Sequence, residues 1–135
     1  MSYSISEIEG IGPVYSEKLG AVGIKTTEAY LERAKDPKGR KALAEETGIE
    51  SGHILKWANM ADLMRISGVG EEYSELLEAA GVDTVKELKH RKPENLAAKM
   101  AEVNEAKKLV RQVPGEAQVI KWVDQAKELP AVMSY

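Results

Sequence analysis

Two turns that contain paired glycines are the parts of this chain whose chemistry could bind a ligand. The first is Gly10-Ile11-Gly12, and the second, 58 residues later (68 − 10), is Gly68-Val69-Gly70. Glycine permits backbone dihedral angles that side chains forbid. The helix expected after each turn starts with backbone N–H groups that lack intrahelical acceptors. These groups and the partial positive charge of the helix start suit a phosphate group.

The residues that follow distinguish the two turns. Behind the first turn no acid stands at the helix start, so the amides of Gly12, Val14 and Tyr15 could hold a phosphate. A plain packing turn is an equally consistent interpretation of the same residues. Behind the second turn, Glu71 and Glu72 stabilise the helix dipole and would occupy or repel an anion. We therefore expect the second turn to be structural.

Basic residues near the first turn extend this candidate site. Lys18 and Lys25 follow the turn, and a cluster over residues 35–41 could track a nucleic-acid backbone if it shares a surface with the turn. Similar runs occur at 86–92 and 107–111, and most such runs are solvated helix faces. The candidate nucleic-acid-binding residues are Gly10, Ile11, Gly12, Val14, Tyr15, Lys18, Lys25, Lys35, Lys38, Arg40 and Lys41.

No residues are spaced for catalysis or metal binding. The chain has no cysteine, which excludes a thiolate nucleophile and a cysteine metal site. His53 and His90 stand apart without ligand spacing, and no Ser/His/Asp grouping can be identified. Trp57 and Trp122 are interpreted as core residues. We expect a protein without enzymatic activity, cofactor or metal.

Composition limits the classes of partner. Of the 135 residues 43% are hydrophobic, which suffices for a core, and no apolar run approaches the length of a membrane span. The start of the chain does not resemble a signal peptide, so we expect a cytoplasmic protein without a membrane partner. The net charge is −3, with 9 basic and 10 acidic residues in 1–65 and 10 and 12 in 66–135. A dedicated duplex binder usually has a positive excess, which argues against strong nucleic-acid binding.

The elements that would position these turns are helices. Apolar residues recur at helical spacing, and no stretch alternates in the manner of a strand. We predict an all-α fold of about ten short helices, including a short leading helix and a helix over 105–112 capped by Asn104. The matching turns indicate a duplication. We place the first repeat at 1–65 and the second at 66–135, with the helix 54–65 shared between them.

These residues resemble the helix-hairpin-helix family. That family has two glycines around an apolar residue, then a small residue and a leucine at helical spacing, then glycine, an apolar residue and threonine. The matching positions are Gly10, Ile11, Gly12, Ser16, Leu19, Gly23, Ile24 and Thr26 in the first repeat, and Gly68, Val69, Gly70, Ser74, Leu77, Gly81, Val82 and Thr84 in the second.

The resemblance implies one compact helical domain with two tandem helix-hairpin-helix repeats of the SAM-like type. It also implies that hairpin amides bind DNA or RNA phosphates without reading sequence, although some members of the family use the motif only for protein contacts. The whole chain resembles, in addition, a family of short bacterial proteins of unknown function. That second resemblance implies a fold but no activity.

Two functions remain open at this point. The first is a weak, sequence-independent nucleic-acid binder that uses Gly10–Tyr15 with the nearby lysines. The second is a protein-interaction adaptor or a self-associating scaffold such as a homodimer. The acidic second turn and the net negative charge favour this second function. In that second case the apolar tail Leu129–Met133 would dock onto a partner or a second copy of the chain. No small-molecule substrate is implied.

Overall fold

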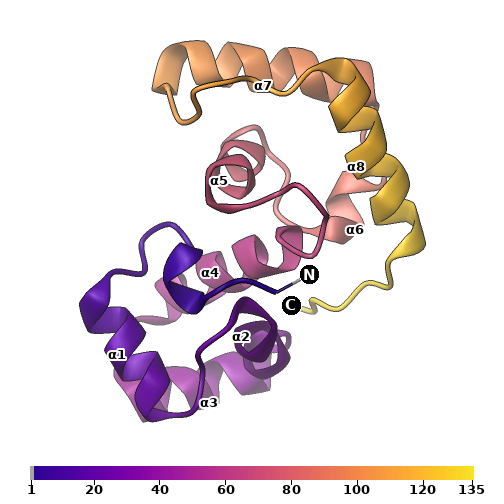
Figure 1. The fold of residues 1–135 in the computed structure, drawn as a ribbon. Coiled ribbons are helices and arrows are strands. Elements are labelled where there is room, and N and C mark those ends of the chain that lie inside the picture. Colours follow the sequence, from indigo (N-terminus) through magenta and orange to yellow (C-terminus); the bar gives the residue numbers. More distant parts are fainter. Residues whose placement is uncertain (1) are drawn as a thin grey trace.

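The computed structural model describes residues 2–135, which form helices joined by short connections (Figure 1). No strand occurs in that range, only an isolated bridge between Ser4 and Thr26. The predicted all-helical fold is confirmed, with eight α-helices in this part of the chain where about ten were expected. The elements are the 3-10 helix η1 (Ile5–Glu7), α1 (Pro13–Ala21), α2 (Thr27–Ala34), α3 (Pro37–Thr47), α4 (Ser51–Leu63), α5 (Glu71–Ala79), α6 (Val85–Leu88), α7 (Pro93–Lys107) and α8 (Glu116–Glu128).

Two predicted elements differ from the observed ones. The leading helix before the first turn is a single 3-10 turn of 3 residues. The predicted helix over 105–112 is wrong, because α7 continues to Lys107. The Asn104 side chain caps no new helix. Instead, its Oδ1 accepts from the amide of Val110 at 2.9 Å and its Nδ2 donates to the Val110 carbonyl at 3.1 Å, which holds the connection after α7.

Side chains cap three of the helices at the positions that the sequence pattern indicates. The hydroxyl of Thr26 accepts from the third amide of α2 at 3.1 Å, and Thr84 does the same for α6 at 3.3 Å. Asp36 accepts from the amide of Gly39 at 2.7 Å, directly before the proline that begins α3. Each cap satisfies one of the amides that a helix start leaves unpaired.

The two glycine turns share one backbone geometry. Gly10 has a φ of 96° and Gly68 a φ of 91°, a region in which glycine carries no steric penalty. The amide of Ile11 donates to the carbonyl of Ile8 at 3.0 Å, and the equivalent bond of the second turn measures 3.1 Å. The turn residue between the glycines is buried in both cases. The turns therefore enter the core in the same way.

The correspondence continues to the end of the helix that follows each turn. After α1 the amide of Ile24 donates to the carbonyl of Leu19 at 3.0 Å, and after α5 the amide of Val82 donates to Leu77 at 2.9 Å. The glycine before each donor has a positive φ, 86° in the first case and 96° in the second. A left-handed glycine with this hydrogen bond is a common helix end.

A tryptophan covers each turn. Trp57 of α4 lies against Gly10, and Trp122 of α8 lies against Gly68. A Cβ placed on these glycines would stand 3.1 Å and 3.4 Å from the respective indole nitrogens. A tyrosine from the helix after each turn packs on the same indole, with ring centroids 5.0 Å apart in the first half and 5.2 Å in the second. The positive φ favours glycine at both positions, and at Gly10 the close approach of the indole adds a steric reason.

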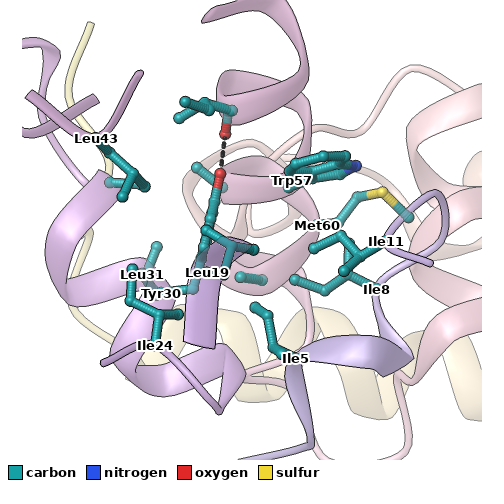
Figure 2. Close-up of a cluster of buried hydrophobic side chains, with 14 of the residues drawn as sticks. Ile5, Ile8, Ile11, Leu19, Ile24, Tyr30, Leu31, Leu43, Trp57 and Met60 are labelled. Atoms are coloured by element: carbon teal, nitrogen blue, oxygen red, sulfur yellow. Dashed lines mark hydrogen bonds between the residues drawn. The ribbon is translucent and has the colours of Figure 1, made fainter. Parts of the chain in front are cut away.

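The buried apolar side chains form two clusters, one drawn from residues 5–64 and one from residues 63–126. Helix α4 supplies side chains to the first cluster and, through Leu63, to the second. In the first cluster the hydroxyl of Tyr30 donates to the carbonyl of Ile54 at 2.8 Å, which leaves no unpaired oxygen in an apolar setting (Figure 2). The clusters meet where α4 ends.

A buried carboxylate joins α4 to the C-terminal half. Asp62 is 1% exposed, and its Oδ2 accepts from the amide of Val85 at the start of α6, at 2.8 Å. Its Oδ1 accepts from Nη1 of Arg65 at 2.7 Å. A buried charge is tolerated when it is both paired and hydrogen-bonded, and Asp62 meets both conditions.

The C-terminal tail, defined as residues 129–135, runs from α8 back to the N-terminal half (Figure 1). Val132 and Met133 pack against the first apolar cluster. The amide of Ser134 donates to the carbonyl of Lys35 at 2.8 Å. Leu129 packs against the second apolar cluster, so the side chains at 129, 132 and 133 contact their own chain, while Pro130 and Ala131 are exposed. Docking of Leu129–Met133 onto a partner stays a prediction.

Substitution of either turn glycine by alanine is expected to destabilise the fold by about 1–3 kcal/mol, because the positive φ strains any residue with a Cβ. Gly10→Ala should cost more than Gly68→Ala, since its Cβ would approach an indole more closely. Chemical denaturation measures both. Gly20→Ala inside α1, where a Cβ meets nothing within 4 Å, is the control and should stabilise slightly. Equal stability of Gly10→Ala and Gly20→Ala would contradict this account.

Removal of the buried carboxylate is expected to lower the free energy of unfolding by on the order of 3 kcal/mol, because Asp62→Ala leaves the Arg65 guanidinium without its ion-pair partner. The amide of Val85 would lose its acceptor as well. Thermal or urea unfolding measures the change, and the exposed Asp124→Asn on α8 is the control. A loss below about 0.5 kcal/mol, the level typical of surface substitutions, would refute the assigned role.

Candidate nucleic-acid interface at the first glycine turn

The start of α1 is open in the structure. Gly12 is the N-cap residue with a φ of −88°, no side chain caps the helix, and no acid stands in its first turn. Within residues 2–135 the amides of Gly12, Val14 and Tyr15 donate to no protein acceptor. A Cβ on Gly12 would meet nothing within 4 Å, and Val14 beside it is 65% exposed. The three amides are therefore accessible to an acceptor from outside.

Aromatic side chains border these amides. Tyr15 packs against the ring of His53 at 5.9 Å between centroids, and His53 stacks on Trp57 at 5.4 Å with an interplanar angle of 10°. The Nζ of Lys18 stands 6.0 Å from the centre of the Tyr15 ring. The exposed edge of this stack thus lies next to the open helix start and carries one cation.

The second turn differs in its tyrosine and its charge, although no side chain caps its helix start either. In the C-terminal half the hydroxyl of Tyr73 donates to the carbonyl of Gln112 at 2.9 Å, so the connection between α7 and α8 lies against the ring that corresponds to Tyr15. The start of α5 carries Glu71 and Glu72. A packing role for Gly68, Val69 and Gly70 stays a prediction.

Carboxyl groups that flank the two turns lie close together, at a place defined here as the carboxyl junction. Burial, then the charge of Glu9 and a hydrogen bond with its side chain, raises the pKa of Glu71 above its usual 4.5. Burial and the charge of Glu9 also raise the pKa of Glu75, while the nearby Lys56 opposes that shift. Glu9, which precedes the first turn, therefore faces α5. The negative potential of this junction limits how far an anion can extend from the first turn in that direction.

The basic candidates divide into separate groups. Lys18 lies in the second turn of α1, whereas Lys25 follows the far end of that helix, where its carbonyl accepts from the amide of Ile5 at 2.9 Å. Lys38 and Lys41 are exposed on α3. Lys35, at the end of α2, pairs with Glu32 at 3.1 Å. No contact described for the last three lysines joins them to the first turn.

Arg40 is withdrawn from the candidate set. It is only 9% exposed, and its guanidinium donates to the carbonyl of Ala34 at 2.9 Å and to that of Ser134 at 2.7 Å. Its burial and its contacts with these two carbonyls leave the guanidinium largely inaccessible to a phosphate. The sequence run over residues 35–41 suggested a solvated basic face, but helical periodicity turns its fourth α3 residue inward.

A comparison with known protein families shows to which of them the chain belongs. The sequence model of the family described as Domain of unknown function (DUF4332) matches residues 9–129. The chain belongs to this family. No curated protein and no solved structure was found to match it. The match spans both glycine turns and ends at the first residue of the tail, so family membership includes the duplicated turns but carries no activity with it. Within residues 2–135 no helix is long and apolar enough to cross a membrane.

Sequence reasoning missed two members of this site. His53 was considered only as a metal ligand, yet it lies one helical turn before Trp57 on α4 and stacks on it. Glu9 directly precedes the first turn in the sequence, and its approach to α5 depends on how the two halves pack. The helical spacing of His53 and Trp57 could have indicated their contact, whereas nothing local could have indicated the position of Glu9.

The carboxyl junction predicts a pH-dependent stability. A carboxyl group whose pKa is raised on folding binds more protons in the folded state than in the unfolded state. Its ionisation therefore lowers the free energy of unfolding as pH rises past about 4.5. Glu9→Gln removes the charge that acts on both Glu71 and Glu75. It should therefore stabilise the protein at pH 7, by less than about 1 kcal/mol because these groups are partly exposed, and the gain should vanish below pH 4.

Thermal unfolding at several pH values measures this effect. The exposed Glu17→Gln on α1 is the matched control and should show no such pH dependence. A lower melting temperature for Glu9→Gln than for wild type at pH 7 would show that the carboxyl groups are not in mutual repulsion.

Proposed function

We propose that this protein is a non-enzymatic helical protein that binds nucleic-acid backbones weakly and without sequence preference, through its first glycine turn. In this proposal the two turns are tandem helix-hairpin-helix motifs, of which only the first contacts phosphate. The observation that carries it is the difference between two turns of equal backbone geometry. Neither helix start is capped by a side chain, but α1 has no acid in its first turn, whereas α5 begins with Glu71 and Glu72. The hydroxyl of Tyr73 is, in addition, held by the α7–α8 connection.

The chemistry of binding follows from the open helix start. A phosphodiester oxygen would accept hydrogen bonds from two or three of these amides, and the partial positive charge of α1 would favour the anion. Lys18 and Lys25 would add attraction over a short distance. Backbone amides contact phosphates and not base edges, so this mode of binding positions a strand without selecting its sequence. The few available cations and the nearby Glu9 keep the affinity low.

A protein-interaction adaptor is the second candidate function, and the carboxyl junction favours it. Glu9, Glu71 and Glu75 come from both halves and lie close enough to raise the pKa of Glu71 and of Glu75 by mutual repulsion, in addition to the effect of burial. A partner with a basic surface would relieve that repulsion, whereas a nucleic acid would increase it. Under this alternative the first turn is a packing turn only.

A titration of labelled duplex DNA at low salt separates the two functions. Gly12→Asp is the informative variant, because its φ suits any residue and aspartate is a favourable N-cap that would accept from the same amides. The fold should remain as stable as wild type or become more stable. DNA affinity should fall about tenfold or more, as expected when hydrogen bonds to a charged group are lost.

Gly70→Asp makes the same change at the second turn and is the matched control. It should leave DNA binding unchanged. Wild-type affinity should decrease as salt increases, because each phosphate contact releases counterions. No measurable binding at low salt, or equal binding by wild type and Gly12→Asp, would reject the first function in favour of the adaptor.

A further inference from the structure

The surface of the N-terminal half that contacts the tail is built for an extended peptide, and it is defined here as the tail site. It is formed by α2, α3, α4 and the residues that directly follow α2 and α4. It contacts residues 129–135, a segment that contains no helix or strand. The tail is held in two ways, by apolar side chains and by its own backbone. This site is separate from the glycine turns and from the function proposed for them.

Two arginines bind backbone carbonyls at the two ends of the tail. Nη2 of Arg65 donates to the carbonyl of Pro130 at 2.7 Å, and Nη2 of Arg40 donates to that of Ser134 at 2.7 Å. Each guanidinium is held by its other nitrogen within the N-terminal half, Arg65 by Asp62 and Arg40 by the carbonyl of Ala34. The donors are therefore fixed in position by partners other than the tail.

The burial of Arg40 is the unusual feature. It is the fourth residue of α3, counted from the proline that begins the helix, and the fourth residue of α7 is Leu96, which is fully buried. The C-terminal half thus fills the equivalent position with an apolar side chain. A buried guanidinium is costly unless its N–H groups are hydrogen-bonded. One of the two carbonyls that accept from Arg40, that of Ser134, belongs to the tail. Packing alone does not require arginine here.

The apolar part of the site selects side chains as well. Val132 and Met133 reach the first apolar cluster, and beside Val132 a cavity of about 280 Å³ remains open. The cavity is lined by Thr27, Glu28, Leu31, Glu32, Ala61, Arg65, Leu129 and Val132. The tail therefore leaves room in the site that a larger apolar side chain could occupy.

The last residue completes the contact. The hydroxyl of Tyr135 donates to Oδ1 of Asn59 at 2.7 Å, and its ring stands 5.5 Å from the guanidinium of Arg40. Tyr135 is nevertheless 69% exposed. The end of the tail is thus attached by one hydrogen bond and a cation–π contact at the surface, which is where release would begin.

The geometry points to a peptide-docking site on the N-terminal half that the tail occupies as an internal ligand. The external ligand is an extended polypeptide segment with two consecutive apolar side chains, whose backbone carbonyls are bound by Arg40 and Arg65. Recognition through carbonyls and two apolar positions makes the site tolerant of sequence elsewhere in the segment. The tethered tail competes at an effective concentration of roughly millimolar, so an external peptide binds strongly only when the tail is displaced.

The test uses the full chain and a synthetic, dye-labelled peptide that copies residues 129–135. In the double variant Val132→Asp/Met133→Asp the aspartates cannot enter the apolar cluster, which frees the site. The peptide should bind this variant at least tenfold more tightly than it binds wild type, as measured by fluorescence anisotropy. A peptide with aspartate in place of its valine and methionine is the control and should not bind.

Arg40→Leu in the double-variant background tests the recognition of the carbonyl. It installs the residue type that the C-terminal half uses at this position, so the fold should persist, as circular dichroism checks, while peptide affinity falls about tenfold or more. Absence of peptide binding by a folded double variant would overturn the proposal. Unchanged binding after Arg40→Leu would overturn the assigned role of the guanidinium.

Hydrogen exchange on the wild-type chain decides the case even if the double variant unfolds. The amide of Ser134, which donates to Lys35, should exchange through local opening and much faster than the amides of α4. Exchange of Ser134 only through global unfolding would show that the tail is an inseparable part of the core, and the proposal would then be wrong.

Discussion

The carboxylate of Asp62 is the interaction on which the relation between the two halves depends. It lies at the end of the one helix that contributes to both apolar clusters, and it reaches across to the first amide of α6 while holding Arg65. Arg65 in turn binds the tail at Pro130. One buried charge therefore orients the C-terminal half and the tail together. Because a charge without partners cannot remain buried, the contacts of Asp62 with Val85 and Arg65 form together, whereas the contact of Arg65 with the tail can open separately.

Much of the local structure could be predicted from sequence, because its causes are local. Glycine with positive φ, threonine and aspartate caps, and proline at the first helical position act within a few residues, and Gly10, Thr26 and Asp36 follow those rules. The helix that we expected after Asn104 is absent, and the hydrogen bonds of the Asn104 side chain explain why. Asparagine can cap a helix or hold a turn, and the choice here is made by Val110, six residues along the chain.

Distant contacts explain what the sequence could not indicate. Arg40 stands in a basic run, and only its partners Ala34 and Ser134 show that it is buried. The first turn and the acids behind the second were identified from their residues, but the contact of the Tyr73 hydroxyl with the α7–α8 connection could not be. That connection spans 108–115, whereas the one between α3 and α4 spans only 48–50. The longer connection therefore gives the tyrosine of the second turn a contact that is absent at the first turn in the described part of the chain.

Charge determines how strongly the open turn could bind phosphate. At a net charge of −3 the protein as a whole does not attract nucleic acid, and surface charges more than about 8–10 Å apart are largely screened at physiological salt. A helix start contributes only about 0.3–1 kcal/mol to an exposed anion. The remaining affinity must come from the amides themselves, which act only at hydrogen-bond distance. A phosphate site at Gly12 would therefore act after contact, with little long-range attraction.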